Sequence, residues 1–174
     1  MSNDLRSSVI RLAHSNPELR PHLLPLLTKT AAVDLNIRGK HILDDARVSG
    51  GAKVSGNAKV RDNAKVSGDA KVSGDAKVSG KAEVSGSAEV SKDAYITNNA
   101  HVDGEAHVYG NAVVKGDAKV SGKAKVYGDA VVWGDAHVYG NADISGTAMI
   151  FGGKWDGSEG PITKGKWKSP GVPA

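Results

Sequence analysis

Apolar and polar residues alternate in a strict six-residue period through most of the chain. An alanine stands at every sixth position from Ala46 to Ala148, and two residues after each alanine comes Val or Ile, from Val48 to Ile150. Residues two apart in an extended strand point to the same side, so each such pair faces inward and the residue between them faces solvent. A strict period of this length predicts a β-solenoid, in which every repeat is one short strand followed by one turn.

The residues between the strands carry turn chemistry. Most of them read Ser-Gly-Asp, Ser-Gly-Asn or a near variant of these, as at residues 73–75. Glycine permits a corner that a Cβ would hinder, and the Asp or Asn that follows tolerates the turn and can bond local backbone. The chain is therefore expected to turn a corner in each of its eighteen repeats.

The pattern aliphatic, small, any, any, small, any, as in Val72-Ser73-Gly74-Asp75-Ala76-Lys77, resembles the hexapeptide-repeat family of left-handed parallel β-helices. That resemblance implies three hexads in each triangular coil, and hence about six coils, stacked at about 4.8 Å, over residues 46–151. The left-handed winding is an exception to the usual crossover rule and is likewise implied by the resemblance. The expected fold class is all-β, a left-handed parallel β-helix solenoid with a short α-helical N-terminal segment.

Residues 1–33 show helical spacing instead of the six-residue period. Apolar residues recur at helical intervals between Asp4 and His14, and Asn16-Pro17 is typical of a helix start. A second stretch, interrupted by two prolines, carries a leucine face formed by Leu19, Leu23, Leu24 and Leu27. This segment is expected to be either a cap over the open first coil or an anchor whose leucine face docks into a groove of another protein.

The stretch from Arg6 to Leu27 resembles N-terminal segments of otherwise unrelated tailed-phage proteins. An N-terminal segment that is shared by proteins with different domains implies that the segment docks them to a common particle. Between this segment and the repeats, residues 34–45 do not keep the six-residue step and are expected to form irregular lead-in strands. Residues 152–174 form a tail rich in Gly and Pro that contains Trp155 and Trp167.

Sorting every third hexad together separates the outward residues into three faces. The first face carries Arg47, Lys65, Glu83, His101, Lys119 and His137, and the second carries Lys53, Lys71, Glu89, His107, Lys125 and Asp143. The third face carries Lys59, Lys77, Tyr95, Val113, Val131 and Met149. Two faces are polar throughout, whereas the third becomes apolar halfway along the solenoid.

Two corner residues, Trp133 and Phe151, follow the third face and enlarge its apolar row of Val113, Val131 and Met149. An exposed row of this size implies a partner. Three alternatives stay open: the tail folds back over the row, a second copy of the chain covers it, or a foreign surface does. Trimers are common among hexapeptide-repeat proteins, so the resemblance favours a homotrimer.

His101, His107 and His137 invite an enzymatic interpretation, because hexapeptide acyltransferases use a histidine base and related carbonic anhydrases bind zinc through histidines at subunit boundaries. With three hexads per coil, His101 and His107 fall on adjacent faces, while His101 and His137 stand about 10 Å apart on one face. No pair within one chain could share a zinc ion, whose ligands lie at about 2 Å. The unbroken register also leaves no inserted loop to build a water-excluding pocket. We therefore expect no metal and no cofactor.

Composition narrows the partners. Lys and Arg total 23 against 19 Asp and Glu, and there is no cysteine, so disulfides and thiolate chemistry are excluded. No apolar run approaches the roughly 20 residues of a membrane span, and the first residues lack a signal peptide's hydrophobic stretch. We expect a soluble protein, in the cytoplasm of the producing cell or on a virion surface, with no membrane partner.

The outward residues of the first two coils, from Arg47 to Lys77, are all basic. They either protect the end of the solenoid against stacking or attach it to an acidic surface. Lysines without interleaved aromatics are poor evidence for base recognition, so a nucleic-acid partner is not expected.

These observations favour a non-catalytic structural or interaction protein, a self-associating β-helix anchored by its N-terminal helices. A phage virion decoration or spike component is its most concrete version. The alternative is a hexapeptide-repeat acyltransferase that uses His101, His107 or His137 as its base.

Overall fold

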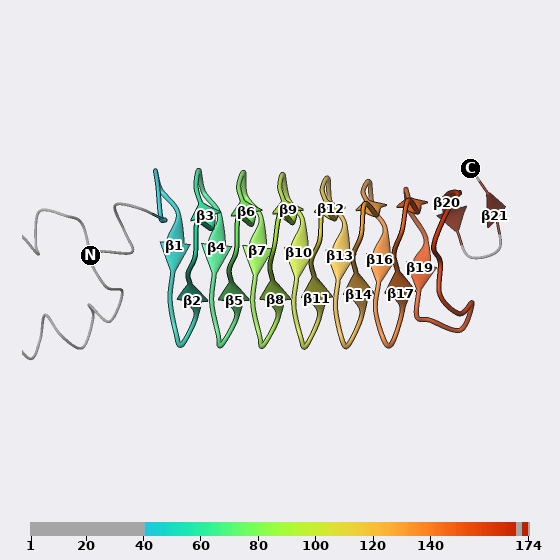
Figure 1. The fold of residues 1–174 in the computed structure, drawn as a ribbon, viewed down its shortest axis with the longest axis horizontal. Helices are drawn as coiled ribbons and strands as arrows, with labels where there is room; N and C mark the ends of the chain where they lie inside the picture. Colours follow the sequence, from blue (N-terminus) through green and yellow to red (C-terminus); the bar gives the residue numbers. More distant parts are fainter. Residues whose placement is uncertain (1–40, 170–171, 174) are drawn as a thin grey trace, which may run out of the picture. The chain divides into compact units, whose positions relative to one another are not determined.

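The structure is a computed structural model that describes residues 41–169 and 172–173, and these residues form a parallel β-solenoid of about seven turns (Figure 1). Three sheets run along it, one for each face expected from the sequence. No helix occurs among the described residues. The helical segment expected at residues 1–33, and most of the lead-in at 34–45, lie outside them.

Each face is built from strands that are one coil apart. The first face holds β1 (Arg47–Val48), β4 (Lys65–Val66), β7 (Glu83–Val84), β10 (His101–Val102), β13 (Lys119–Val120), β16 (His137–Val138) and β19 (Lys154–Trp155). The second face holds β2 (Lys53–Val54), β5 (Lys71–Val72), β8 (Glu89–Val90), β11 (His107–Val108), β14 (Lys125–Val126) and β17 (Asp143–Ile144). The third face holds β3 (Lys59–Val60), β6 (Lys77–Val78), β9 (Tyr95–Ile96), β12 (Val113–Val114), β15 (Val131–Val132), β18 (Met149–Ile150), β20 (Lys166–Ser169) and β21 (Val172–Pro173).

The inward assignment of the period is confirmed. From Ala58 to Val138, every alanine and every Val or Ile of the repeat is fully buried. In the parallel register each inner valine lies against the inner valine of the next coil, as Val102 does against Val84 and Val120. Backbone bonds hold the coils together, for example from the amide of His101 to the carbonyl of Ala118 at 2.9 Å.

The solenoid is longer than the six coils expected, because the tail adds a turn. Trp155 takes the inner position of the first face opposite Val138 and is fully buried. Ile162 bridges to Ile144 on the second face. Residue Trp167 then pairs with Ile150 on the third. The inner positions are no longer six residues apart here, which is why the sequence period ends before the fold does.

The two ends of the described solenoid are finished differently. At the N-terminal end, Ile42 makes a parallel bridge to Val60 on the third face. At the C-terminal end, β20 turns back into the antiparallel β21. Among the described residues, no helix is long and apolar enough to cross a membrane.

Candidate functional site

The apolar row of the third face is a continuous stripe in the structure. Strand pairing sets Tyr95, Val113, Val131 and Met149 directly above one another, one coil apart. The valine side chains are half-buried and Met149 is 36% exposed, because their bodies lie against neighbouring coils. We use the term apolar stripe for Val113, Val131, Met149, Trp133 and Phe151.

The aromatic part of the stripe is ordered by its own contacts. Trp133 and Phe151 meet edge to face, with ring centroids 4.9 Å apart, and Trp133 is 42% exposed. The Lys115 ammonium lies 5.3 Å from the centre of the Trp133 ring, within the range of a cation–π contact. The largest exposed apolar side chain of the solenoid is therefore held beside the valines.

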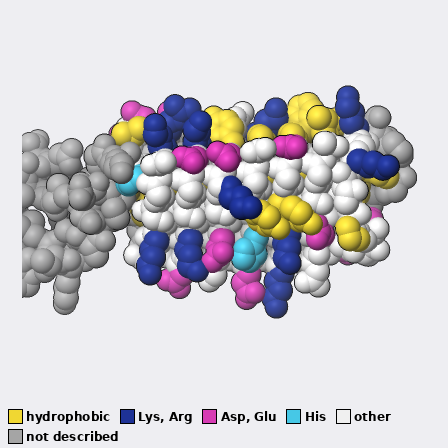
Figure 2. All heavy atoms as spheres, in the orientation of Figure 1, with side chains coloured by type: hydrophobic (Ala, Val, Ile, Leu, Met, Phe, Trp, Pro, Cys, Tyr) yellow, Lys and Arg dark blue, Asp and Glu magenta, His cyan; other side chains and the backbone are white. Residues whose placement is uncertain are grey.

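Lysines bound the apolar stripe at both ends. Below Tyr95 the register continues to Lys77, and above Met149 it continues to Lys166. Hydrophobic side chains appear in Figure 2 along the upper edge, where the third-face strands lie in Figure 1, with Lys and Arg side chains among them. The stripe is thus a defined patch on a polar body.

The tail does not fold back over the apolar stripe. Trp155 is fully buried at the end of the first face, and Trp167 continues the third face in line with Ile150. The indole nitrogens of both tryptophans bond backbone carbonyls of the tail itself, Gly152 at 2.7 Å and Lys164 at 2.9 Å. Of the three alternatives, a second copy and a foreign surface stay open.

Tyr95 extends the same row with polar character. Its hydroxyl accepts a hydrogen bond from Ser79 Oγ at 3.1 Å, and Ser79 also contacts Thr97 Oγ1 at 3.0 Å. The bonds with Ser79 and Thr97 hold the pKa of the Tyr95 phenol below its ordinary value. These two residues stand at consecutive corners after the third face, so the coil period predicts that they are neighbours.

The histidines of the polar faces belong to charged ladders. Glu83 Oε1 accepts a bond from Lys65 Nζ at 2.7 Å, and Glu83 Oε2 lies 3.6 Å from His101 Nδ1 in the next coil. The hydrogen bond from Lys65 holds the pKa of Glu83 below its ordinary value. The second face repeats the arrangement with Lys71, Glu89 and His107.

The three candidate catalytic histidines are not brought together. His101 and His137 share the first face but are separated by Lys119 in the register, and His107 lies on the second face. His137 Nε2 is 3.3 Å from Ser121 Oγ, and its ring lies against Tyr139. Within the part of the chain that the structure describes, no group of three or more His, Asp or Glu side chains could hold a metal ion.

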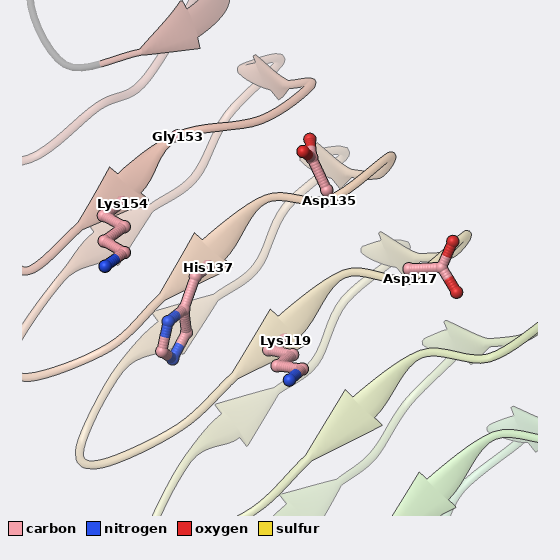
Figure 3. Close-up of a pocket in the computed structure, with 6 residues that line it drawn as sticks. All are labelled: Asp117, Lys119, Asp135, His137, Gly153 and Lys154. Atoms are coloured by element: carbon pink, nitrogen blue, oxygen red, sulfur yellow. The ribbon is translucent and has the colours of Figure 1, made fainter.

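His137 lines an open hollow of about 480 Å³. The hollow lies between the first face and the corner at which the chain passes from the third face to the first. Figure 3 shows Asp117 and Asp135 on one side of this hollow and Lys119, His137 and Lys154 on the other. Gly152, which the register places next to Asp135, leaves the last position of the carboxylate row without a side chain, and Gly153 lines the hollow beside it. This hollow was not expected from the sequence, because it forms where the tail begins to depart from the period.

A second aromatic cluster lies at the corner after the second face. The rings of Tyr109 and Tyr127 stack in parallel with centroids 4.8 Å apart, and the Lys92 ammonium lies 5.7 Å from the centre of the Tyr109 ring. Burial of the Tyr109 hydroxyl raises its pKa above the ordinary value. Face sorting of the sequence predicts this pair, since the residues are 18 positions apart.

The predicted leucine face of Leu19, Leu23, Leu24 and Leu27 lies outside the described residues. Comparison of the chain with models of protein families, with curated proteins and with solved structures finds no match.

Proposed function

We propose that this protein is a non-catalytic structural or interaction protein, a β-helix that self-associates through the apolar stripe of its third face. The observation that carries the proposal is the stripe itself, with Trp133 at 42% exposure and Met149 at 36% on an otherwise polar solenoid. Contiguous apolar patches of this kind mark interaction sites. A homotrimer and the left-handed winding of the hexapeptide-repeat family are the finer parts of this proposal.

A partner with the same regular spacing along its length would fit the apolar stripe. The outward residues repeat at the coil spacing of about 4.8 Å, so another copy of the same solenoid presents matching side chains at the same intervals. Coils supported mainly by their neighbours give a rigid body that needs no partner to fold. These properties favour assembly over turnover of a small substrate.

The N-terminal segment supplies the anchor in this proposal. Its resemblance to segments of tailed-phage proteins supports a virion component, such as a decoration or spike protein, as the specific version. The leucine face of residues 1–33 then docks to the particle, and the solenoid projects from it.

The mass of the purified particle tests the self-association. Val131→Lys places a charge in the centre of the apolar stripe, where burial of an unpaired ammonium costs several kcal/mol, so we expect this variant to dissociate to monomers. Lys125→Glu changes an exposed residue on the second face and should leave the mass unchanged. Equal masses for Val131→Lys and the parent, measured by sedimentation equilibrium, would show that the stripe is ordinary solvent-facing surface.

Deletion of residues 1–33 tests the anchor. We expect the solenoid to keep its circular dichroism spectrum and its own oligomeric mass, because each coil is supported by its neighbours, yet to lose attachment to any particle. Loss of the folded solenoid on deletion would identify the segment as a cap and end the docking proposal.

The alternative, an acyltransferase, has one observation in its favour, the hollow beside His137. In that case acetyl-coenzyme A should bind saturably, and His137→Ala should abolish the binding. Isothermal titration of the parent with acetyl-coenzyme A decides between the two, since the scaffold proposal expects no heat of binding.

A further inference from the structure

The two edges of the third face carry opposite charge. By the same alternation, the residues two before and two after each outward residue lie on the outer side of the face at its two corners, where Ser79 is buried against the Tyr95 hydroxyl. Along the leading edge these are Asn57, Asp75, Asp93, Asn111, Asp129 and Thr147. Along the trailing edge they are Arg61, Ser79, Thr97, Lys115, Trp133 and Phe151. The leading edge is acidic, and the trailing edge is basic and aromatic.

These edge charges lie at the surface, although Arg61 also acts on the Tyr95 phenol and Lys115 lies over the Trp133 ring. Asp75, Asp93, Asp129, Arg61 and Lys115 are all exposed, and none of them makes an ion pair within the described residues. Two of the carboxylates accept a bond only from a neutral amide, Asp75 from Asn57 at 3.0 Å and Asp129 from Asn111 at 2.8 Å. No cation of the described residues is therefore paired with a carboxylate of the acidic edge.

We propose that copies of this chain associate in parallel and in register, with the leading edge of one third face against the trailing edge of its neighbour. This inference rests on the proposed self-association and specifies its geometry. A rotation axis along the solenoid, two-fold or three-fold, brings each acidic edge against a basic edge. A two-fold axis across the solenoid would instead bring acidic edge against acidic edge. Opposite charges across an interface fix the orientation of the partners.

The heights of the charges support the same arrangement. Lys115 and Asp129 are 14 residues apart, as are Arg61 and Asp75, whereas stacked residues such as Val113 and Val131 are 18 apart. In parallel copies each cation therefore lies less than one coil, about 4.8 Å, below the carboxylate of its neighbour. Trp133 belongs to the same coil as Asp129, one coil after Lys115. The Lys115 ammonium lies 5.3 Å from the Trp133 ring, so the lysine side chain extends toward the coil of Asp129.

The lysines that bound the apolar stripe do not discriminate between the orientations. Parallel copies set Lys77 against Lys77, and antiparallel copies set Lys77 against Lys166. Lysine faces lysine in both cases. The edge charges are thus the feature that selects the parallel form.

Cysteine cross-linking tests the orientation directly, because the chain has no cysteine of its own. The double variant Lys115→Cys with Asp129→Cys places its two cysteines on opposite edges of the third face. Within one chain they are farther apart than the roughly 7 Å between Cα atoms that a disulfide spans, so they cannot bond to each other. We expect oxidation of this double variant to link chains covalently, and each single variant to stay unlinked. A ladder that ends at two chains indicates a two-fold axis, and one that ends at three indicates a three-fold axis.

Charge reversal tests the parallel arrangement a second time, without a cross-link. Lys115→Asp should raise the dissociation constant of the oligomer about tenfold or more, and the double reversal Lys115→Asp with Asp129→Lys should restore it to within about threefold of the parent. Asp103→Lys, an exposed residue at the corner after the first face, is the matched control and should change nothing.

The outcomes separate the two proposals. A parent chain that sediments as a monomer at all concentrations would overturn both self-association and its geometry. An oligomer that cross-links through Asp129→Cys alone, with no gain in the double variant, would overturn only the parallel arrangement. An oligomer whose dissociation constant is unchanged by Lys115→Asp would likewise overturn only the parallel arrangement.

Discussion

A methyl group at a single corner glycine should destabilise the whole stack of coils. Gly104 has a φ of 66°, and a Cβ at this position would lie 2.9 Å from the backbone nitrogen of Gly122 in the next coil. Gly160 in the tail has a φ of 76°, but a Cβ there would meet nothing within 4 Å. Both glycines therefore have a left-handed backbone conformation. Only Gly104 is also closely approached by the backbone of the next coil.

The difference between the two alanine variants isolates the cost of that approach. Left-handed backbone costs an L-residue roughly 1–2 kcal/mol, so Gly160→Ala should lower the free energy of unfolding by about that amount. Gly104→Ala adds a steric overlap with backbone that cannot rotate away, worth about 1–3 kcal/mol more. The total is about 2–5 kcal/mol for Gly104→Ala.

Urea unfolding followed by circular dichroism measures both variants against the parent. We expect the transition of Gly104→Ala to lie well below that of Gly160→Ala, with the slopes of the two transitions equal. If the two variants unfold at the same urea concentration, then the corners of adjacent coils are not in contact and the spacing of the stack is wrong.

Three further outcomes follow from the same structure. Trp155→Ala should lower the free energy of unfolding by about 3–5 kcal/mol, because the fully buried indole closes the end of the core, and urea unfolding measures this. Ala100→Leu should cost about 1–3 kcal/mol by overpacking, and a neutral unfolding midpoint would contradict the inward assignment. Because the pKa of Glu83 is lowered in the folded state, its ion pair stabilises the fold above the ordinary glutamate value of 4.5, and that contribution is lost as the pH falls through the lowered pKa. Lys65→Met should move the carboxyl titration of Glu83, followed by NMR, back toward 4.5, whereas Lys71→Met, its counterpart on the second face, should not.

The sequence predicts the core and the face sorting well, for a physical reason. One inner residue pair per hexad, repeated without insertion, determines both burial and the coil neighbour of every outward residue. The contact of Val113 with Val131 and the stacking of Tyr109 on Tyr127 follow from counting 18 residues. Neither depends on the detailed conformation of any side chain.

The sequence period does not predict the last turn, because burial there follows position in space and not spacing in sequence. Trp155 comes five residues after Ile150 and Ile162 seven after Trp155, yet each takes an inner place on the next face. Loops of unequal length can deliver a residue to the same face. The period does not predict the hollow beside His137 for the same reason, since Gly153 and Lys154 line it and belong to the tail.

The face sorting also limits how this protein can change in length. Because residues 18 apart lie on one face, a duplication of 18 residues between Val113 and Val131 would lengthen the apolar stripe by one coil and leave its neighbours in place. A duplication of six residues would also keep every strand and every corner, but it would turn all later residues by one face. Met149 would then stand above a different row from Val113, and the stripe would be cut in two. Tandem growth of the gene can therefore preserve the fold in steps of one hexad but preserves the stripe only in steps of a whole coil.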